Sequence, residues 1–215
     1  MIRTFWEGFG LQRTLTHVAL AALTIGGIYA GTLYWQGAGL IYVGTIGFGY
    51  LCVLFLCVTL LLGPLNLLRK RINPVNIDLR RDTGIWAGIT GCLHVVFAVI
   101  RDSRGNILSF FFGGGGIALV NVRDVSNDLG LIATILLIVL MVLSNQLTLR
   151  KLKGKRWKTL QRLNYVLVPL AIVHTLIYER LNGREKPFID VTAIVILLVL
   201  IVQFIGVSTY QKRKA

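Results

Sequence analysis

The chain has 215 residues, of which 55% are hydrophobic and only 15% are charged, and its mean hydropathy is +0.71. This composition excludes an ordinary soluble domain and is typical of a protein that crosses a membrane several times. The formal net charge of +14 would suit a nucleic-acid-binding protein, but the positions of the charges give it a different explanation.

The apolar stretches predict six membrane-spanning helices, because about 17–25 residues are needed to cross a bilayer. In chain order the predicted helices cover residues 14–35, 40–62, 83–100, 129–149, 163–178 and 187–210. Pro64 is expected to end the second helix, since proline cannot donate a backbone hydrogen bond. Backbone groups in lipid must be paired internally. The predicted fold is therefore an all-α, six-helix bundle that forms a single domain over residues 1–215, without a convincing internal repeat.

Six crossings place both termini on the same side of the membrane. Of the 23 Lys and Arg residues, 17 fall on that side and 6 on the other. Cytoplasmic loops are the ones rich in Lys and Arg, so both termini are predicted to be cytoplasmic and the protein to lie in the inner (plasma) membrane. The positive charge then reflects this bias, together with attraction to anionic lipid, and requires no nucleic acid.

Two histidines, His94 and His174, lie within predicted spans, where an ionisable side chain is costly and marks a candidate functional site. His94 follows Arg81 by 13 residues, and His174 follows Arg162 by 12. At about 1.5 Å per helical residue, both lie roughly 18–20 Å from the inner boundary. Two imidazoles at one depth on different helices can ligate a haem iron from both sides. We therefore predict that they bind haem b.

Two other interpretations of these histidines remain open. Either one could be a buried residue that is hydrogen-bonded to a neighbouring helix. They could also bind zinc, but the sequence offers no carboxylate or third histidine at that depth to complete a tetrahedral site.

The residues around the pair are candidates for contacts with the haem. Gly84, Gly88 and Gly91 precede His94 on one flank of its helix, where missing side chains would let the macrocycle approach. The same spacing would also serve helix packing. Arg101 and Arg180 follow the two histidines, so they could pair with haem propionates or simply mark the membrane boundary.

Two segments carry a resemblance to the ferric-reductase-like transmembrane family, RRDTGIWAGITGCLH (80–94) and GKRWKTLQRLNYVLVPLAIVH (154–174). The family pattern combines an RR…GLW…LH helix with a GKRW…LHR…Y…H helix. The matching residues are Arg80, Arg81, Gly84, Trp86, Leu93 and His94 in the first segment, and Gly154–Trp157, Leu160, Arg162, Tyr165 and His174 in the second. Within the family, both segments look most like the haem-binding membrane subunits of bacterial periplasmic methionine sulfoxide reductase systems.

One position departs from the family pattern. Gln161 stands where the family usually has a histidine, and the similar NADPH oxidases and ferric reductases use two histidine pairs to stack two haems. The resemblance therefore implies a single haem toward the outer side. A flavin (FMN or FAD) or a quinone near the cytoplasmic face could replace the inner haem, held at a basic surface formed by Arg80, Arg81, Lys155, Arg156 and Trp157. Interfacial snorkelling of these side chains is the alternative.

His17 lies only about 6 Å beyond Arg13 along the first helix and cannot share a plane with the other two histidines. A structural or interfacial role is expected for it. Hydrogen bonding to a quinone or flavin is the alternative.

The resemblance implies an electron-transfer subunit rather than a complete enzyme. Electrons would pass from a cytoplasmic flavin reductase or from membrane quinol to the haem. They would then pass to an extracytoplasmic acceptor, which is a redox protein such as a methionine sulfoxide reductase, or ferric iron. The segment Phe110–Gly116 is expected to form part of the docking surface for this acceptor, or else to dip into the lipid headgroups.

A non-haem transporter or scaffold is the competing function, with the histidines acting as hydrogen-bonding links between helices. A transporter should carry ionisable residues inside the membrane. None of the nine acidic residues falls inside a predicted span, which counts against a transporter.

Overall fold

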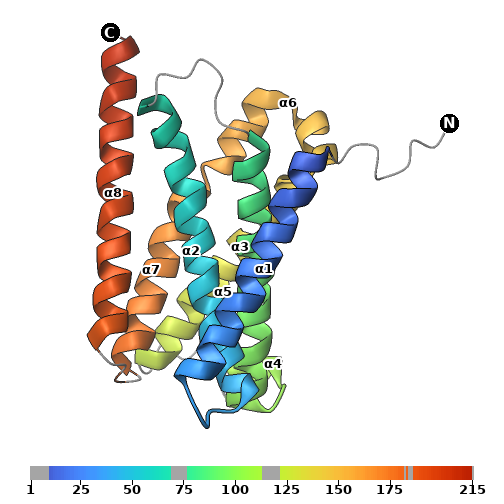
Figure 1. Cartoon of the computed structure of the whole chain (residues 1–215), viewed down its shortest axis with the longest axis vertical. Helices are drawn as coiled ribbons and strands as arrows, with labels where there is room; N and C mark the ends of the chain where they lie inside the picture. Colours follow the sequence, from blue (N-terminus) through green and yellow to red (C-terminus); the bar gives the residue numbers. More distant parts are fainter. Residues whose placement is uncertain (1–9, 69–76, 113–121, 182, 184–185, 215) are drawn as a thin grey trace, which may run out of the picture.

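A computed structural model describes residues 10–68, 77–112, 122–181, 183 and 186–214. Every regular element in these described ranges is a helix (Figure 1). The helices are α1 (Leu11–Tyr34), α2 (Leu40–Leu68), α3 (Ile77–Ser103), α4 (Ile107–Phe112), α5 (Val122–Leu143), α6 (Gln146–Gln161), α7 (Asn164–Leu181) and α8 (Lys186–Lys214).

Six helical segments are long and apolar enough to cross a membrane, which confirms the predicted number. They are Leu11–Tyr34, Leu40–Leu65, Asp78–Ser103, Val122–Leu143, Thr159–Leu181 and Ile189–Lys212. The chain is therefore a multi-pass membrane protein. The start of α1, the whole of α6 and the end of α8 lie at the upper end of the bundle in Figure 1, and α4 lies at the lower end.

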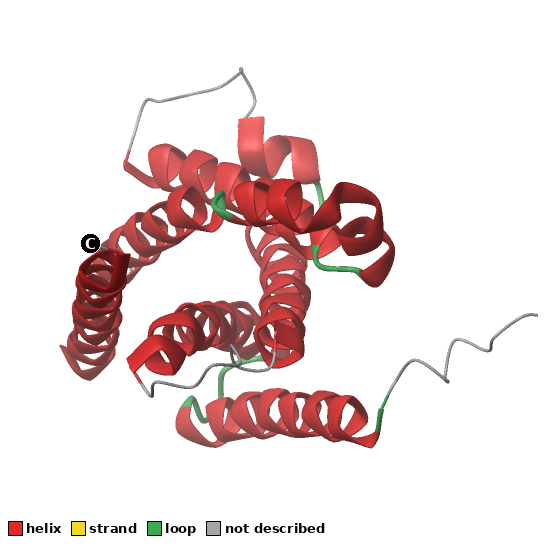
Figure 2. Ribbon diagram, turned by 90° about the horizontal axis from the view of Figure 1, so that it is seen from above, coloured by secondary structure: helices red, strands yellow, loops and turns green. Residues whose placement is uncertain are grey.

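The interior of the bundle is formed mainly by α2, α3, α5 and α7. α2 packs against α1, α3, α7 and α8, and α5 packs against α3 and α7. Figure 2, seen from above, shows α1 and α8 at the periphery. The largest apolar core cluster joins the four inner helices, with Leu51, Phe55 and Leu56 from α2, Ala87 from α3, Ala133, Leu137 and Leu140 from α5, and Leu167 from α7.

The prediction that Pro64 ends the second helix is wrong, because α2 continues through it to Leu68. A proline inside a helix leaves the carbonyl four residues earlier without its usual partner. Here that carbonyl belongs to Leu60, and it accepts a hydrogen bond of 2.7 Å from the side-chain amide of Gln203 on α8. The helix can therefore continue, and its altered turn becomes an attachment point for α8.

The predicted boundaries of the fourth span also differ from the structure. Residues 129–149 were expected to be one helix, but α5 begins at Val122 and ends at Leu143. A separate helix, α6, follows, because the side chain of Asn145 caps it by accepting a hydrogen bond of 2.7 Å from the Thr148 amide. Asparagine is among the preferred residues at this capping position.

The expectation that no acidic residue lies inside a span is wrong: by the observed bounds, seven acidic residues fall within the spanning segments, and two of them are buried. Asp82 on α3 and Glu179 on α7 fall within membrane-spanning segments and are each only 1% exposed. Asp82 is bound by Arg13 of α1. Glu179 was expected in the outer loop, but α7 extends to Leu181 and carries this side chain into the interface with α2 and α8.

The segment Phe110–Gly116 is described only in part. Phe110 to Phe112 form the end of α4, whereas residues 113–116 lie outside the described residues. The proposed docking role of the glycines is therefore not addressed by the structure.

We predict that Gly206→Ala weakens the attachment of α8. A Cβ at this position would lie 2.7 Å from Cβ of Pro64 and 3.3 Å from its Cα, so α8 would have to move away from α2. Overpacking of this kind costs about 1–3 kcal/mol. The measurement is the free energy of unfolding in detergent, followed by circular dichroism. Gly26→Ala is the matched control, because nothing lies within 4 Å of its Cβ position, and equal losses in both variants would contradict the prediction.

Candidate functional site

A cavity lies among α2, α3, α5 and α7, in the half of the bundle that is nearer to α4. The open space within it amounts to about 1030 Å³, part of which opens to the outside. Its lining includes Thr45, Gly49, Tyr50 and Cys52 from α2, Gly91, His94 and Arg101 from α3, Phe110 and Phe111 from α4, Asn127, Gly130 and Leu137 from α5, and Leu167, His174 and Tyr178 from α7.

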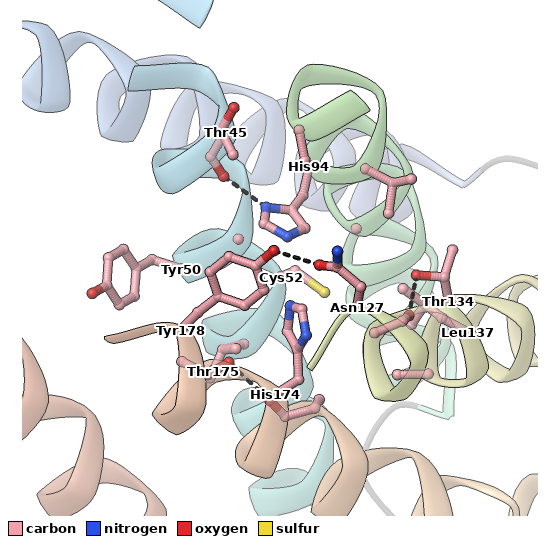
Figure 3. A pocket seen from close by; sticks show the side chains of 18 of the residues that line it. Thr45, Tyr50, Cys52, His94, Asn127, Thr134, Leu137, His174, Thr175 and Tyr178 are labelled. Atoms are coloured by element: carbon pink, nitrogen blue, oxygen red, sulfur yellow. Dashed lines mark hydrogen bonds between the residues drawn. The ribbon is translucent and has the colours of Figure 1, made fainter. Parts of the chain in front are cut away.

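The structure brings His94 and His174 together in this cavity. Figure 3 shows their rings pointing toward one another from α3 and α7. The ring centroids are 6.1 Å apart, and the ring planes are nearly perpendicular at 84°. Metal–imidazole bonds are about 2.0–2.1 Å long, so two imidazoles on opposite sides of one metal ion have centroids about 6 Å apart. The observed separation therefore fits a pair of axial ligands.

A backbone carbonyl holds each imidazole. Nδ1 of His94 lies 2.6 Å from the carbonyl oxygen of Thr45 on α2. Nδ1 of His174 lies 2.8 Å from that of Ser126 on α5. Because a carbonyl can only accept, Nδ1 must carry the proton in both rings, and Nε2 then carries the lone pair that can ligate a metal. Metal-binding histidines usually have such a second hydrogen bond, which sets the tautomer and the ring orientation.

A glycine makes room for each ring, one helical turn after the carbonyl that holds it. A Cβ at Gly49 would lie 2.9 Å from Nδ1 of His94, and a Cβ at Gly130 would lie 2.7 Å from Cε1 of His174. Real Cβ atoms essentially never come this close, so these positions need glycine for the rings to reach the carbonyls. The sequence analysis missed both glycines.

The same local pattern therefore occurs twice, although the sequence showed no convincing internal repeat. Thr45 and Gly49 on α2 hold a histidine of α3, and Ser126 and Gly130 on α5 hold a histidine of α7. The separations along the chain are 49 residues from carbonyl to histidine in the first case and 48 in the second. A Ser/Thr-x-x-x-Gly pattern in the helix that precedes each histidine helix is the sequence signal that could have identified these residues.

Of the glycine flank predicted on α3, only Gly91 lines the cavity. A Cβ at Gly88 would lie 2.6 Å from the sulfur of Met141 on α5, and one at Gly84 would lie 3.9 Å from a methyl carbon of Thr59 on α2. Gly88 therefore allows α3 and α5 to pack closely, which was the alternative explanation for this spacing.

Polar and aromatic side chains line the cavity toward α4. Arg101 lines it and binds Asp102 through two hydrogen bonds of 2.6 and 2.9 Å. Tyr178 packs against His174 with ring centroids 5.1 Å apart, and its hydroxyl donates to the side-chain oxygen of Asn127 (Figure 3). Arg180 is exposed and is not among the residues that line the cavity.

His17 does not share the cavity and belongs to a separate polar cluster between α1 and α3. Its Nδ1 accepts a hydrogen bond of 3.0 Å from the indole of Trp86, and its Nε2 lies 3.6 Å from the carboxylate of Asp82. The guanidinium of Arg13 binds the same carboxylate at 2.5 and 3.1 Å. These contacts join α1 to α3, which agrees with the structural role expected for His17.

The residues of the predicted basic surface lie near the other end of the bundle from α4. Arg80 and Arg156 are exposed, whereas Arg81 is buried and pairs with Asp78 at 2.8 Å. Trp157 donates a hydrogen bond of 2.9 Å to the carbonyl of Leu143, at the α5–α6 junction. The side chain of Lys155 lies outside the described residues. None of the described side chains of this predicted basic surface lines the cavity.

Gln161 also lies away from the cavity, at the end of α6, where its amide nitrogen is 3.4 Å from the Ser144 hydroxyl. Over the described part of the chain, no three His, Cys, Asp or Glu side chains gather into a potential metal site. The histidine pair is thus a site with two protein ligands, which suits a metal whose remaining positions are filled by a macrocycle.

Comparisons with known proteins match a family model and curated relatives. The family model described as "Ferric reductase like transmembrane component" matches residues 43–172, which include His94 and end just before His174. Three curated relatives are each named protein-methionine-sulfoxide reductase heme-binding subunit MsrQ. The one from Herminiimonas arsenicoxydans is 32% identical over 164 residues, covering 74% of this chain and 67% of the relative. The relative from Salmonella arizonae is 31% identical, and the match covers 66% of this chain and 67% of the relative. The relative from Salmonella dublin is 32% identical, and the match covers 68% of each chain. No solved structure matches the chain.

We predict that Asp82→Asn destabilises the packing of α1 on α3. Removing the carboxylate charge leaves the Arg13 guanidinium, whose side chain is 13% exposed, without its ionic partner. Breaking a buried ion pair costs about 3–5 kcal/mol, and partial exposure of Arg13 reduces the expected loss to about 3 kcal/mol or less. This loss of stability is measured as the change in the free energy of unfolding in detergent. Asp190→Asn, at an exposed position of α8, is the control and should change little. A similarly small change for Asp82→Asn would show that the cluster does not stabilise the fold.

Proposed function

Since the chain belongs to the ferric-reductase-like transmembrane family, we propose that it binds one haem b between His94 and His174 and transfers electrons across the membrane. The observation that carries this proposal is the histidine pair itself. Two rings lie 6.1 Å apart in a cavity, and each has its Nδ1 bound to a backbone carbonyl. The relatives named as haem-binding subunits support the same assignment.

The surroundings of the pair also fit a haem. When bound, a haem would supply one-electron iron chemistry, and with His94 and His174 both holding the iron it would be suited to electron transfer rather than to oxygen binding. Thr45 and Ser126 hold the two imidazoles, and Gly49 and Gly130 make room for their rings, whereas Gly91, which also lines the cavity, admits the side chain of Leu137. Arg101, at the edge of the cavity, is placed to neutralise a propionate, whereas the exposed position of Arg180 favours a boundary role.

One haem per chain is the expected stoichiometry. The position that usually carries another histidine in the family is Gln161, whose amide lies beside Ser144 outside the cavity. His17 is engaged with Trp86 and Asp82 in the cluster between α1 and α3. The described residues therefore offer one pair of facing imidazoles.

The basic end of the bundle is proposed to face the cytoplasm of a cell whose inner membrane holds the protein. α6 and the ends of α1 and α8 lie together at this end (Figure 1), and Lys- and Arg-rich segments remain on the cytoplasmic side. An electron donor, either a flavin reductase or membrane quinol, would then act at this end. The exposed Arg80 and Arg156 make it suitable for binding the phosphate of FMN or FAD, and a quinone is the other candidate.

The electron acceptor is proposed to act at the opposite end, near α4. The cavity opens in this half of the bundle, and Phe110 and Phe111 of α4 line it. The relatives' names associate them with a protein-methionine-sulfoxide reductase. We infer a periplasmic redox protein of this kind as the acceptor, with ferric iron as the alternative. The chain would then act as a single-domain electron-transfer subunit.

The preference over a transporter no longer rests on the absence of acidic residues, since Asp82 and Glu179 lie within spans. It rests instead on the histidine pair. A role in linking helices would explain the hydrogen bond from each Nδ1 to a carbonyl of an adjacent helix. It would not explain why the two rings also face each other across a cavity.

We predict that His94→Ala and His174→Ala each abolish the haem absorption bands of the purified protein, because each removes one axial ligand. His17→Ala, the control histidine, should retain them. The measurement is the reduced-minus-oxidised visible spectrum, together with the haem-to-protein ratio, which should be near one in the wild type. Full haem content in His174→Ala, or a ratio near two in the wild type, would contradict the proposal.

We further predict that Gly130→Ala lowers haem retention several-fold without removing a ligand. The added methyl group would displace the His174 ring from the Ser126 carbonyl, and loss of such an outer contact typically costs 10–100-fold in metal affinity. Haem retention is measured as the rate at which the purified protein loses haem to an excess of apomyoglobin. Gly63→Ala is the control, since the nearest atom to its Cβ position lies at an ordinary 3.6 Å. Equal retention in both variants would show that the ring does not depend on Gly130.

A further inference from the structure

Glu179 is a buried carboxylate that has no role in the electron transfer proposed above. It follows His174 by five residues on α7 and is only 1% exposed. Its Oε1 accepts two hydrogen bonds, 2.9 Å from the Tyr50 hydroxyl of α2 and 3.0 Å from the Thr192 hydroxyl of α8. Its Oε2 is buried and has no hydrogen-bond partner within the described structure.

The described surroundings of this carboxyl group supply hydrogen-bond donors but no cation. An ionised carboxylate is expensive to bury unless it is paired with a cation. Among the described side chains, none forms an ion pair with Glu179. Among the side chains that the structure describes, the charged groups at the same end of the bundle are Arg101 and Asp102 on α3, Arg104 just after it, Arg123, Asp124 and Asp128 on α5, Arg180 on α7 and Asp190 on α8. In general, the protonation of a buried carboxyl group that has no cation beside it depends on other charges nearby.

Glu179 is connected to the histidine cavity through a single side chain. Tyr50 lines the cavity, and Figure 3 shows its hydroxyl pointing away from the histidines. That hydroxyl is the one that donates to Glu179. The carboxyl group therefore lies one hydrogen bond beyond a residue of the cavity wall. Its surroundings have a low dielectric constant, so charges interact there more strongly than in water.

We propose that Glu179 is a proton-binding site coupled to the redox state of the cofactor between His94 and His174. Reduction of a haem held there by one electron from the donor would lower the positive charge in the cavity by one. The Glu179 carboxylate then takes up one proton from the aqueous phase on the α4 side and becomes a carboxylic acid. Oxidation by the acceptor releases that proton to the same phase. This inference rests on the proposed haem.

The coupling has a definite sign. Because reduction favours protonation, protonation must equally favour reduction, and the midpoint potential falls as the pH rises. If one proton accompanies each electron, the equilibrium constant for reduction falls at most tenfold per pH unit, which lowers the midpoint potential by about 59 mV. Glu179→Gln keeps the shape of the side chain but cannot titrate. Its potential should therefore stay near the low-pH value of the wild type, above the wild type at high pH and with a smaller slope.

The experiment is a spectroelectrochemical titration of the purified full chain in detergent between pH 5 and 9. Asp190→Asn, which removes an exposed carboxylate from α8, is the matched control and should keep the wild-type slope because solvent screens its charge. Thr192→Val serves as a second variant outside the cavity. It removes one donor to the carboxylate, so the pH range in which the potential falls should move to higher pH. Reduced-minus-oxidised infrared spectra give an independent readout, because the carbonyl band of a protonated carboxylic acid should appear on reduction and be missing in Glu179→Gln.

The outcomes separate this inference from the proposed function. Absence of haem bands in the wild type would overturn both. Haem bands together with identical pH profiles in the wild type, Glu179→Gln and Thr192→Val would overturn the proton site and leave the haem assignment intact. If Glu179→Gln does not fold, an unshifted profile for Thr192→Val is sufficient to reject the proton site. A reduced slope in Glu179→Gln, an upward shift in Thr192→Val and an unchanged Asp190→Asn would establish it.

Discussion

The site depends on one repeated interaction, the hydrogen bond from a histidine Nδ1 to the backbone carbonyl of a neighbouring helix. A buried imidazole would otherwise rotate toward any available polar atom, and a metal ligand that can rotate binds poorly. The carbonyl is already part of a helix, so its position is as rigid as the helix itself. Thr45 and Ser126 thus transfer the rigidity of α2 and α5 to His94 and His174.

That interaction constrains the helix packing around it. Each ring reaches its carbonyl only across a glycine, Gly49 or Gly130, so α2 must lie close to α3 and α5 close to α7. Helices in lipid gain little from hydrophobic contact with one another, and small residues that permit close approach become decisive. α8 follows the same principle at a different place, where Gly206 packs against Pro64 and Gln203 binds the carbonyl that the proline leaves available.

The two buried carboxylates lie at opposite ends of the bundle and differ in their partners. Asp82 is bound by the guanidinium of Arg13 and joins α1 to α3. Glu179 receives only hydroxyl donors from α2 and α8. An ion pair compensates a buried charge, whereas hydroxyl donors supply hydrogen bonds without an opposite charge. The first carboxylate therefore has a structural role, and the second is suited to respond to events in the cavity.

The sequence by itself determined the number of spanning helices and the common depth of the two histidines. Both follow from quantities that do not depend on tertiary structure, namely the thickness of the apolar layer and the constant rise of a helix. The family motifs around Arg80 and Trp157 were likewise readable from the sequence, and the comparisons support them.

Only the tertiary structure decided which face each helix turns toward its neighbours. In a helix that is apolar on all sides, hydropathy does not distinguish the lipid-facing surface from the packed one, because lipid and protein interior are equally apolar. For this reason the sequence analysis expected a glycine flank on α3 but missed Gly49 and Gly130, and it placed Glu179 in a loop. A glycine that receives an imidazole and one that merely permits packing have the same hydropathy, and only the position of the neighbouring helix separates them.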